Sequence, residues 1–172
     1  MHRLKTRPQF QATMAAGTAA RTAHFALHRL PLPLATPLSG PDCTPAACQS
    51  QALFALPAGA PTGPWLGAMV PKRWARRAVT RNAIKRQIYA VAAERRAELP
   101  HAAHVVRLRA AFDRKQFVSA SSDALKSAVR AELQQLFARA ARAARTDERG
   151  PAAEAAPAPA PRQGAADRGP RP

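Results

Sequence analysis

Apolar side chains recur at helical spacing in two stretches of the second half of the chain. The first stripe consists of Ile84, Ile88, Val91 and Ala92. The second follows a helix-start signal at residues 121–123 and consists of Leu125, Val129, Leu133, Leu136 and Ala140. A helix can bury a stripe of this kind on one side. The pattern therefore predicts two amphipathic helices, the first closed at residues 99–100.

Three shorter segments have the character of β-strands. Residues 22–30 alternate apolar and polar side chains, whereas residues 65–70 and 104–109 are brief segments rich in apolar side chains. Such segments are typical of strands that are buried on one or both faces. We expect these three segments to pair in one sheet.

A short helix is predicted ahead of the first strand. Thr6 and Gln9 have the spacing of a capping box, with a proline in the first turn between them. Phe10 and Met14 then lie one turn apart on the same helix face. Gly17 is well placed to end the helix.

Two segments lack such periodicity. Residues 31–64 are rich in Pro and Gly, and only residues 52–56 resemble a short edge strand. Residues 146–172 consist largely of Ala, Pro, Gly and Arg. We expect one domain over residues 1–145, with residues 31–64 as an elongated, partly disordered loop between two strands and residues 146–172 as a disordered tail.

The order helix, strand, long loop, strand, helix, strand, helix predicts an α+β fold, a small sandwich of helices and sheet around one core. Aromatic residues make up only 5% of the chain, so the core must consist mainly of aliphatic side chains. The strand–helix–strand unit over residues 65–109 would ordinarily take a right-handed crossover.

Charge changes this picture most in residues 70–86. The 172-residue chain has a formal net charge of +17, and no acidic residue lies between Lys72 and Arg86. The cations here are Lys72, Arg73, Arg76, Arg77, Arg81, Lys85 and Arg86. In the helical part, these cations and Asn82 lie beside the apolar stripe. A merely solvated helix face usually mixes Glu with Lys, so this unmixed one favours binding to nucleic acid or another polyanion.

No constellation of catalytic residues accompanies this charge. The 10 acidic residues are scattered, and the 5 histidines lack metal-ligand spacing. Cys43 and Cys48 lie in the Pro-rich segment, where we expect free thiols in a reducing compartment. We therefore expect no catalytic residue, no metal held by the protein and no membrane span.

The basic stretch resembles the signature of the bacterial ribonuclease P protein component. It reads Lys72-Arg73-x-x-Arg76-Arg77-Ala78-x-x-Arg81-Asn82-x-Ile84-Lys85-Arg86. The family pattern runs Lys-Lys/Arg, a short spacer, then Arg-Asn-Arg-x-Lys-Arg at the start of a helix. Ala83 stands where the family usually has Arg. The resemblance covers roughly residues 3–30 and 65–140. The Pro-rich loop and the tail have no counterpart in the family's usual pattern.

This resemblance implies a left-handed strand–helix–strand crossover of the ribosomal protein S5 domain 2-like kind. It also implies that the chain is the protein subunit of ribonuclease P, the endonuclease that removes the 5′ leader of precursor tRNA. Catalysis would lie in the RNA subunit, and Mg²⁺ would be held mainly by that RNA and the substrate. The partners would be ribonuclease P RNA and precursor tRNA, with one protein per RNA subunit, in the cytoplasm.

The resemblance also assigns residues. The seven cations and Asn82 would bind the RNA subunit, and Phe10, Met14 and His28 would line a cleft for the 5′ leader. The family uses aromatic side chains there, on which unstacked bases can lie. Plain core packing is the alternative for Phe10 and Met14. Independently of the resemblance, alternation along the last strand puts Arg107 and Arg109 on its outer face, where they would extend the positive surface or simply face solvent.

Two other functions fit parts of the pattern. A non-catalytic binder of structured RNA, of the ribosomal-protein type, would share the charge and the size, but the ordered Arg-Asn motif argues against it. A basic amphipathic module on an anionic membrane would need bulky apolar anchors, whereas the central helix offers Ile, Val and Ala.

Overall fold

The computed structural model describes residues 1–32, 52–55, 63–113, 117 and 122–148. The strands are β1 (His2–Arg3), β2 (Thr18–Arg21), β3 (Phe25–Pro31), β4 (Trp65–Met69) and β5 (Ala102–Leu108). The helices are α1 (Arg7–Ala15), α3 (Ala78–Glu94) and α4 (Asp123–Glu148), with a short 3-10 helix η1 (Arg96–Glu98). Most of the predicted loop at residues 31–64, and the chain after residue 148, lie outside the described residues.

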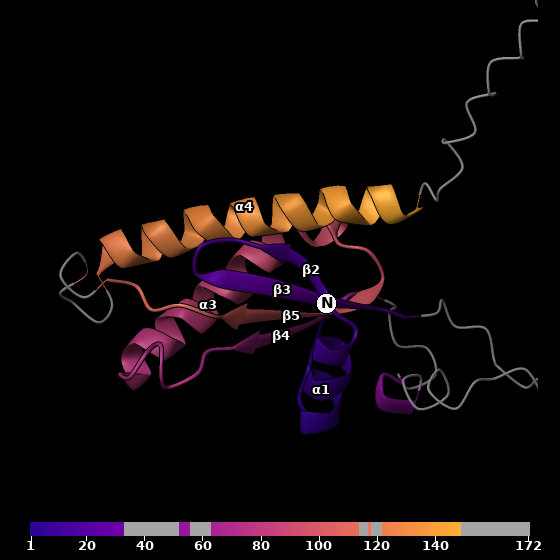
Figure 1. Ribbon diagram of the computed structural model, residues 1–172, viewed down its shortest axis with the longest axis horizontal. Helices are drawn as coiled ribbons and strands as arrows, with labels where there is room; N and C mark the ends of the chain where they lie inside the picture. Colours follow the sequence, from indigo (N-terminus) through magenta and orange to yellow (C-terminus); the bar gives the residue numbers. More distant parts are fainter. Residues whose placement is uncertain (33–51, 56–62, 114–116, 118–121, 149–172) are drawn as a thin grey trace, which may run out of the picture.

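The five strands form one mixed sheet in the order β1-β4-β5-β3-β2 (Figure 1). β1, β4 and β5 are parallel neighbours, whereas β3 is antiparallel to both β5 and β2. Figure 1 shows α4 running along one side of the sheet and α1 projecting from the other. The predicted α+β sandwich is confirmed, with α3 connecting β4 to β5. The left hand of that connection stays what the resemblance implies.

The main core lies between the sheet and the two long helices, and both predicted stripes are buried there. The sheet contributes Phe25, Leu27, Leu66, Val106 and Leu108. Every residue of the α3 stripe is at most 1% exposed, and every residue of the α4 stripe at most 4%. Burying one such aliphatic side chain stabilises the fold by roughly 1.5–3 kcal/mol. These stripes therefore fix which sides of α3 and α4 face the sheet.

A smaller cluster covers the opposite face of the sheet, next to α1. Its buried members are Leu4, Leu32, Phe54, Trp65, Ala103 and Val105. Residues 52–54 form a helical turn, so the expected edge strand at residues 52–56 is wrong for the part that is described. Phe54 instead packs its ring edge against Trp65, with the ring centroids 5.5 Å apart. A brief apolar run does not by itself distinguish strand from helix.

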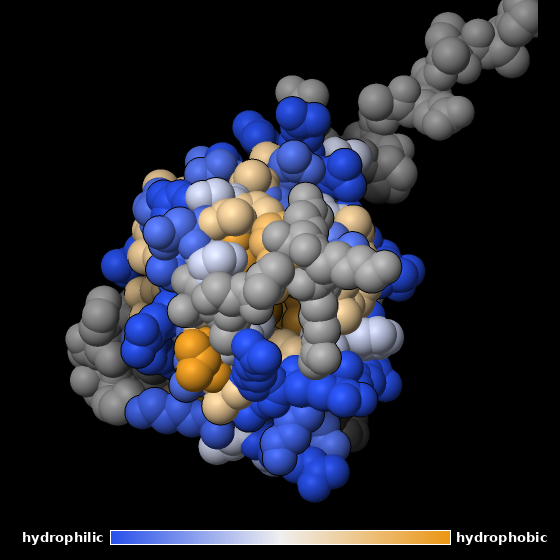
Figure 2. Space-filling model, turned by 90° about the vertical axis from the view of Figure 1, so that its left-hand side faces the viewer, coloured by the Kyte–Doolittle hydropathy of each residue, from blue (hydrophilic) through white to orange (hydrophobic). Residues whose placement is uncertain are grey.

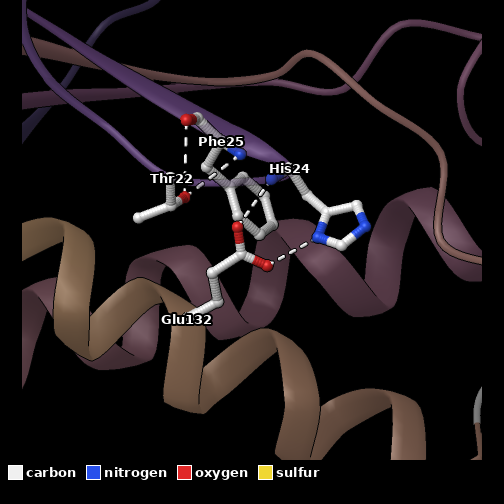
Figure 3. Close-up of polar contacts among 4 residues, drawn as sticks. All are labelled: Thr22, His24, Phe25 and Glu132. Carbon is white, nitrogen blue, oxygen red and sulfur yellow. Dashed lines mark hydrogen bonds and ion pairs between the residues drawn. The ribbon is translucent and has the colours of Figure 1, made fainter.

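The strand expected at residues 22–30 begins only at Phe25, and the unpredicted strand β2 precedes it. The Thr22 backbone N–H donates to Phe25 O at 2.9 Å and closes a turn. Glu132 of α4 accepts the His24 backbone N–H at 2.6 Å and contacts His24 Nδ1 at 2.8 Å (Figure 3). Burial alone would raise the pKa of Glu132, but these hydrogen bonds lower it below its ordinary value. The Glu132 carboxylate thus holds the turn at residues 22–25 against α4.

Both long helices end differently from the prediction. α3 stops at Glu94, whose carboxylate pairs with Arg130 of α4 at 2.6 Å. The 3-10 helix η1 then leads to the extended Leu99. α4 continues to Glu148, past the expected domain boundary at residue 145, so residues 146–148 belong to the helix rather than to a tail.

His104 makes a pH dependence of stability predictable. Burial lowers its pKa to about 4, because the imidazolium would be desolvated between the sheet and the helices. The unfolded chain binds this proton from about pH 6.5 downward. The contribution to the free energy of unfolding is therefore fully present above pH 6.5 and falls by roughly 3 kcal/mol as the pH drops to about 4.

Replacing His104 by Leu should remove that contribution. Denaturant unfolding at about pH 7 and about pH 5 would measure it. Between these two pH values, the free energy of unfolding of the variant should fall by about 2 kcal/mol less than that of the wild type. Equal losses in both proteins would show that His104 does not set the acid sensitivity.

Candidate nucleic-acid interface

A tight loop carries the first cations of the basic stretch. β4 ends at Met69, and the backbone N–H groups of Trp74 and Ala75 both donate to Pro71 O at 3.2 Å. The Arg73 guanidinium lies over the Trp74 ring, 5.1 Å from its centroid. The loop therefore holds its cations at the end of the sheet, directly before α3 begins.

Arg81 is used differently from the other cations. Its Nη1 donates to Ala75 O at 3.1 Å and to Arg76 O at 2.7 Å, and its side chain is only partly exposed. These bonds satisfy two loop carbonyls and tie the loop to the first turn of α3. The structure places this predicted RNA-binding residue in a role that shapes the loop.

The remaining predicted cations are exposed, and none of them has an ion-pair partner among the described residues. They are Lys72, Arg73, Arg76, Arg77, Lys85 and Arg86. Asn82 is exposed beside them. Figure 2, which views the molecule from the end where β4 and β5 finish, shows a largely hydrophilic surface with small apolar patches. The positive charge of this surface is therefore not neutralised by the part of the chain that is described.

The sequence pattern missed one cation of this surface. Arg3 lies over the ring of Tyr89, 4.4 Å from its centroid. Tyr89 shares a ridge of α3 with Asn82 and Arg86. β1 brings Arg3 there because it pairs with the start of β4, and a two-residue strand has no periodicity that would reveal it. The sequence shows only that Arg3, Lys5 and Arg7 lie close together near the N-terminus.

On the α1 side of the sheet, the register aligns side chains in three rows. The first row is Trp65, Ala103 and Leu30; the second is Gly67, Val105 and His28; the third is Met69, Arg107 and Ala26. Phe10 sits on the second row, since a Cβ at Gly67 would lie 2.5 Å from Phe10 Cε1. The missing side chain of Gly67 thus admits the Phe10 ring.

The three predicted leader residues come together around α1. Phe10 and Met14 are partly buried hydrophobic residues packed against the α1-side cluster. His28 is partly exposed, and its Nδ1 lies 3.0 Å from Gly17 O at the end of the helix. Burial lowers the pKa of His28; the hydrogen bond to Gly17 O opposes this shift, and nearby Arg107 adds to it, so the balance favours the neutral imidazole. Core packing explains part of this arrangement, but all three side chains keep some exposed surface.

Within the described ranges, no group of three or more His, Cys, Asp or Glu side chains is placed to hold a metal ion. Cys43 and Cys48 fall outside those ranges. None of the helices that the structure describes is long and apolar enough to cross a membrane.

Comparison with known proteins decides the family. The family model described as Ribonuclease P matches residues 1–141. The chain belongs to the ribonuclease P protein family. The ribonuclease P protein component of Burkholderia pseudomallei strain 1106a is 41% identical over 99 residues, which are 56% of this chain and 73% of that protein. That of Bordetella parapertussis is 44% identical over 77 residues, 45% of this chain and 58% of that protein.

A solved structure agrees with the fold. Staphylococcus aureus RNase P protein superimposes with a TM-score of 0.51, covering 80% of this chain and 94% of that one at 15% sequence identity. The chain is therefore the protein subunit of ribonuclease P, an endoribonuclease that processes the 5′ end of tRNA, and its partner is ribonuclease P RNA. This identification sets aside the ribosomal-protein and membrane alternatives.

Replacing Gly67 by Ala should disturb the α1 side selectively. The added methyl would lie 2.5 Å from the Phe10 ring and 2.8 Å from Leu4 Cδ1, so these side chains, or α1 with Phe10, must shift. Overpacking of this kind costs roughly 1–3 kcal/mol of the free energy of unfolding, which denaturant unfolding would measure. The double variant Gly67→Ala, Phe10→Ala should show a coupling between the two sites. A Gly67→Ala variant as stable as the wild type would contradict the close Phe10 contact.

Proposed function

We propose that the two faces of this subunit bind two different RNAs. The surface formed by the loop before α3 and the exposed ridges of α3 docks on ribonuclease P RNA. The cleft beside α1 holds the single-stranded 5′ leader of precursor tRNA. The observation that carries the first assignment is the row of exposed cations without partners among the described residues.

Phosphate binding suits the start of α3 for two reasons. The helix begins at Ala78 after Arg77, which forms no side-chain cap, and its first turn contains no acidic residue. Its first backbone N–H groups and the positive end of the helix dipole therefore favour an anion. The flanking cations add attraction that releases counterions from RNA.

Individual residues contribute in different ways. Lys72, Arg73, Arg76, Arg77, Asn82, Lys85 and Arg86 are the proposed direct contacts. Arg81 supports them by holding the loop through Ala75 O and Arg76 O. Arg3, stacked on Tyr89, extends the same ridge toward β1. Ala83 offers no such contact at its position.

The leader cleft uses Phe10, Met14 and His28. A Phe ring and a neutral imidazole can each stack on an unpaired base, whereas Met contacts it by dispersion. Arg107 in the third row adds a cation for the leader phosphates. The proposal is supported by the way these side chains gather on one side of the sheet while keeping exposed surface.

Catalysis itself is assigned to the RNA subunit, with Mg²⁺ held mainly by that RNA and the substrate. The protein places cations between two polyanions, lowers their repulsion and so reduces the Mg²⁺ needed to bring them together. We infer one protein per RNA subunit, a cytoplasmic location, and a single RNA-binding domain that carries the loop at residues 31–64 as an insertion.

Cleavage of precursor tRNA at low Mg²⁺ tests this function. With a bacterial ribonuclease P RNA, cleavage at the mature 5′ end should appear only when the protein is added. Phe10→Ala should raise KM for a substrate with a full leader but not for one with a shortened leader, because only the former reaches the cleft. A protein that binds both RNAs but leaves the rate unchanged would refute the proposal.

The docking surface predicts a specific salt dependence. Arg86→Ala should weaken binding to the RNA subunit and reduce the slope of log K against log [salt] by about 1. The double variant Arg81→Ala, Arg86→Ala should weaken it further, because the loop is also released. Arg142→Ala, an exposed cation on α4, is the matched control and should change the slope less. Unchanged affinity and slope in the double variant would remove α3 as the docking element.

A further inference from the structure

One described piece of the Pro-rich insertion packs on the folded domain. In the helical turn at residues 52–54, Leu53 O accepts a hydrogen bond from Gln9 Nε2 at 2.8 Å. Phe54 is only 7% exposed and packs edge-on against Trp65. The insertion therefore touches both α1 and the start of β4.

The Gln9 side chain makes two kinds of hydrogen bond at this contact. Its Oε1 accepts the backbone N–H groups of Lys5 at 2.9 Å and Thr6 at 3.1 Å, which completes the predicted start of α1. Its amide nitrogen is left for Leu53 O, and the whole residue is 8% exposed. One buried side chain thus links the first turn of the helix to the insertion.

The turn lies on the side of α1 that faces away from the ends of β4 and β5 (Figure 1). It belongs to the cluster that contains Trp65 and Ala103 of the first row. Phe10 covers Gly67 in the second row, and the third row, with Met69 and Arg107, lies beyond. The turn therefore contacts α1 on the side opposite to the third row.

We propose that this turn is a positioning element for the leader cleft, an inference that rests on the proposed function of that cleft. α1 has only nine residues, and a helix that short is marginal by itself. The apolar contact of Phe54 and the bond to Leu53 O hold the helix over the sheet before the leader arrives. A cleft organised in advance binds its ligand with less ordering cost.

The variant Gln9→Glu removes the hydrogen bond to Leu53 O and keeps the other bonds of the residue. The carboxylate still accepts the two N–H groups and suits a helix start, but it cannot donate to Leu53 O and places a charge beside that carbonyl. With the assembled holoenzyme, KM for precursor tRNA with a full leader should rise several-fold while kcat and the affinity for the RNA subunit stay unchanged. Phe54→Ala should act in the same way, and Phe54→Leu, which keeps an apolar side chain, should restore most of the affinity.

Thermal unfolding checks that each variant is folded, and a substrate with a shortened leader serves as the control. Wild-type KM values in both Gln9→Glu and Phe54→Ala would overturn the positioning role. So would an equal loss with full and shortened leaders, or a loss of RNA-subunit binding, since either would indicate general destabilisation. Failure of the cleft assignment is recognised separately, because the wild type itself would then show no dependence of KM on the leader.

Discussion

Helix α3 must bury one side and leave a run of like charges on another, and much of the fold depends on this requirement. Ile84 and Ile88 are at most 1% exposed, whereas the neighbouring Lys85 and Arg86 face solvent. Parallel strands need a crossover between them, and α3 provides it for β4 and β5. Seating the apolar stripe on the sheet therefore also sets the direction in which the cations point.

Three acidic residues of the described ranges make contacts away from the start of α3. Glu94 pairs with Arg130, Glu132 holds the His24 turn, and Asp123 pairs with Lys126. The first two contacts link α4 to α3 and to the turn between β2 and β3, whereas the third lies within the first turn of α4. Exposed pairs of this kind contribute only modestly to stability. None of the ion pairs among the described residues places a carboxylate beside the cations at the start of α3. In our proposal, RNA supplies the missing negative charge.

Packing on the α1 side of the sheet depends on Gly67, which has no side chain. Gly67 lets the Phe10 ring reach the sheet, and Leu4 packs beside it. Trp65, one row away, packs against Phe54 of the turn at residues 52–54. The face is thus closed at one end and carries Arg107 in its last row.

The sequence by itself determined the features that depend on near neighbours along the chain. The stripes of α3 and α4, the capping box of Thr6 and Gln9 at the start of α1, and the order of the basic motif all repeat or pair within a few residues, so local spacing reveals them. Tertiary structure alone decided the pairing of β1 with β4, the Arg3–Tyr89 stack and the bonds of Gln9 to Leu53 and of His24 to Glu132. The partners in these contacts are separated by 44 residues in one case and 108 in another. No periodic pattern records such a contact, because it exists only once the sheet and helices have packed.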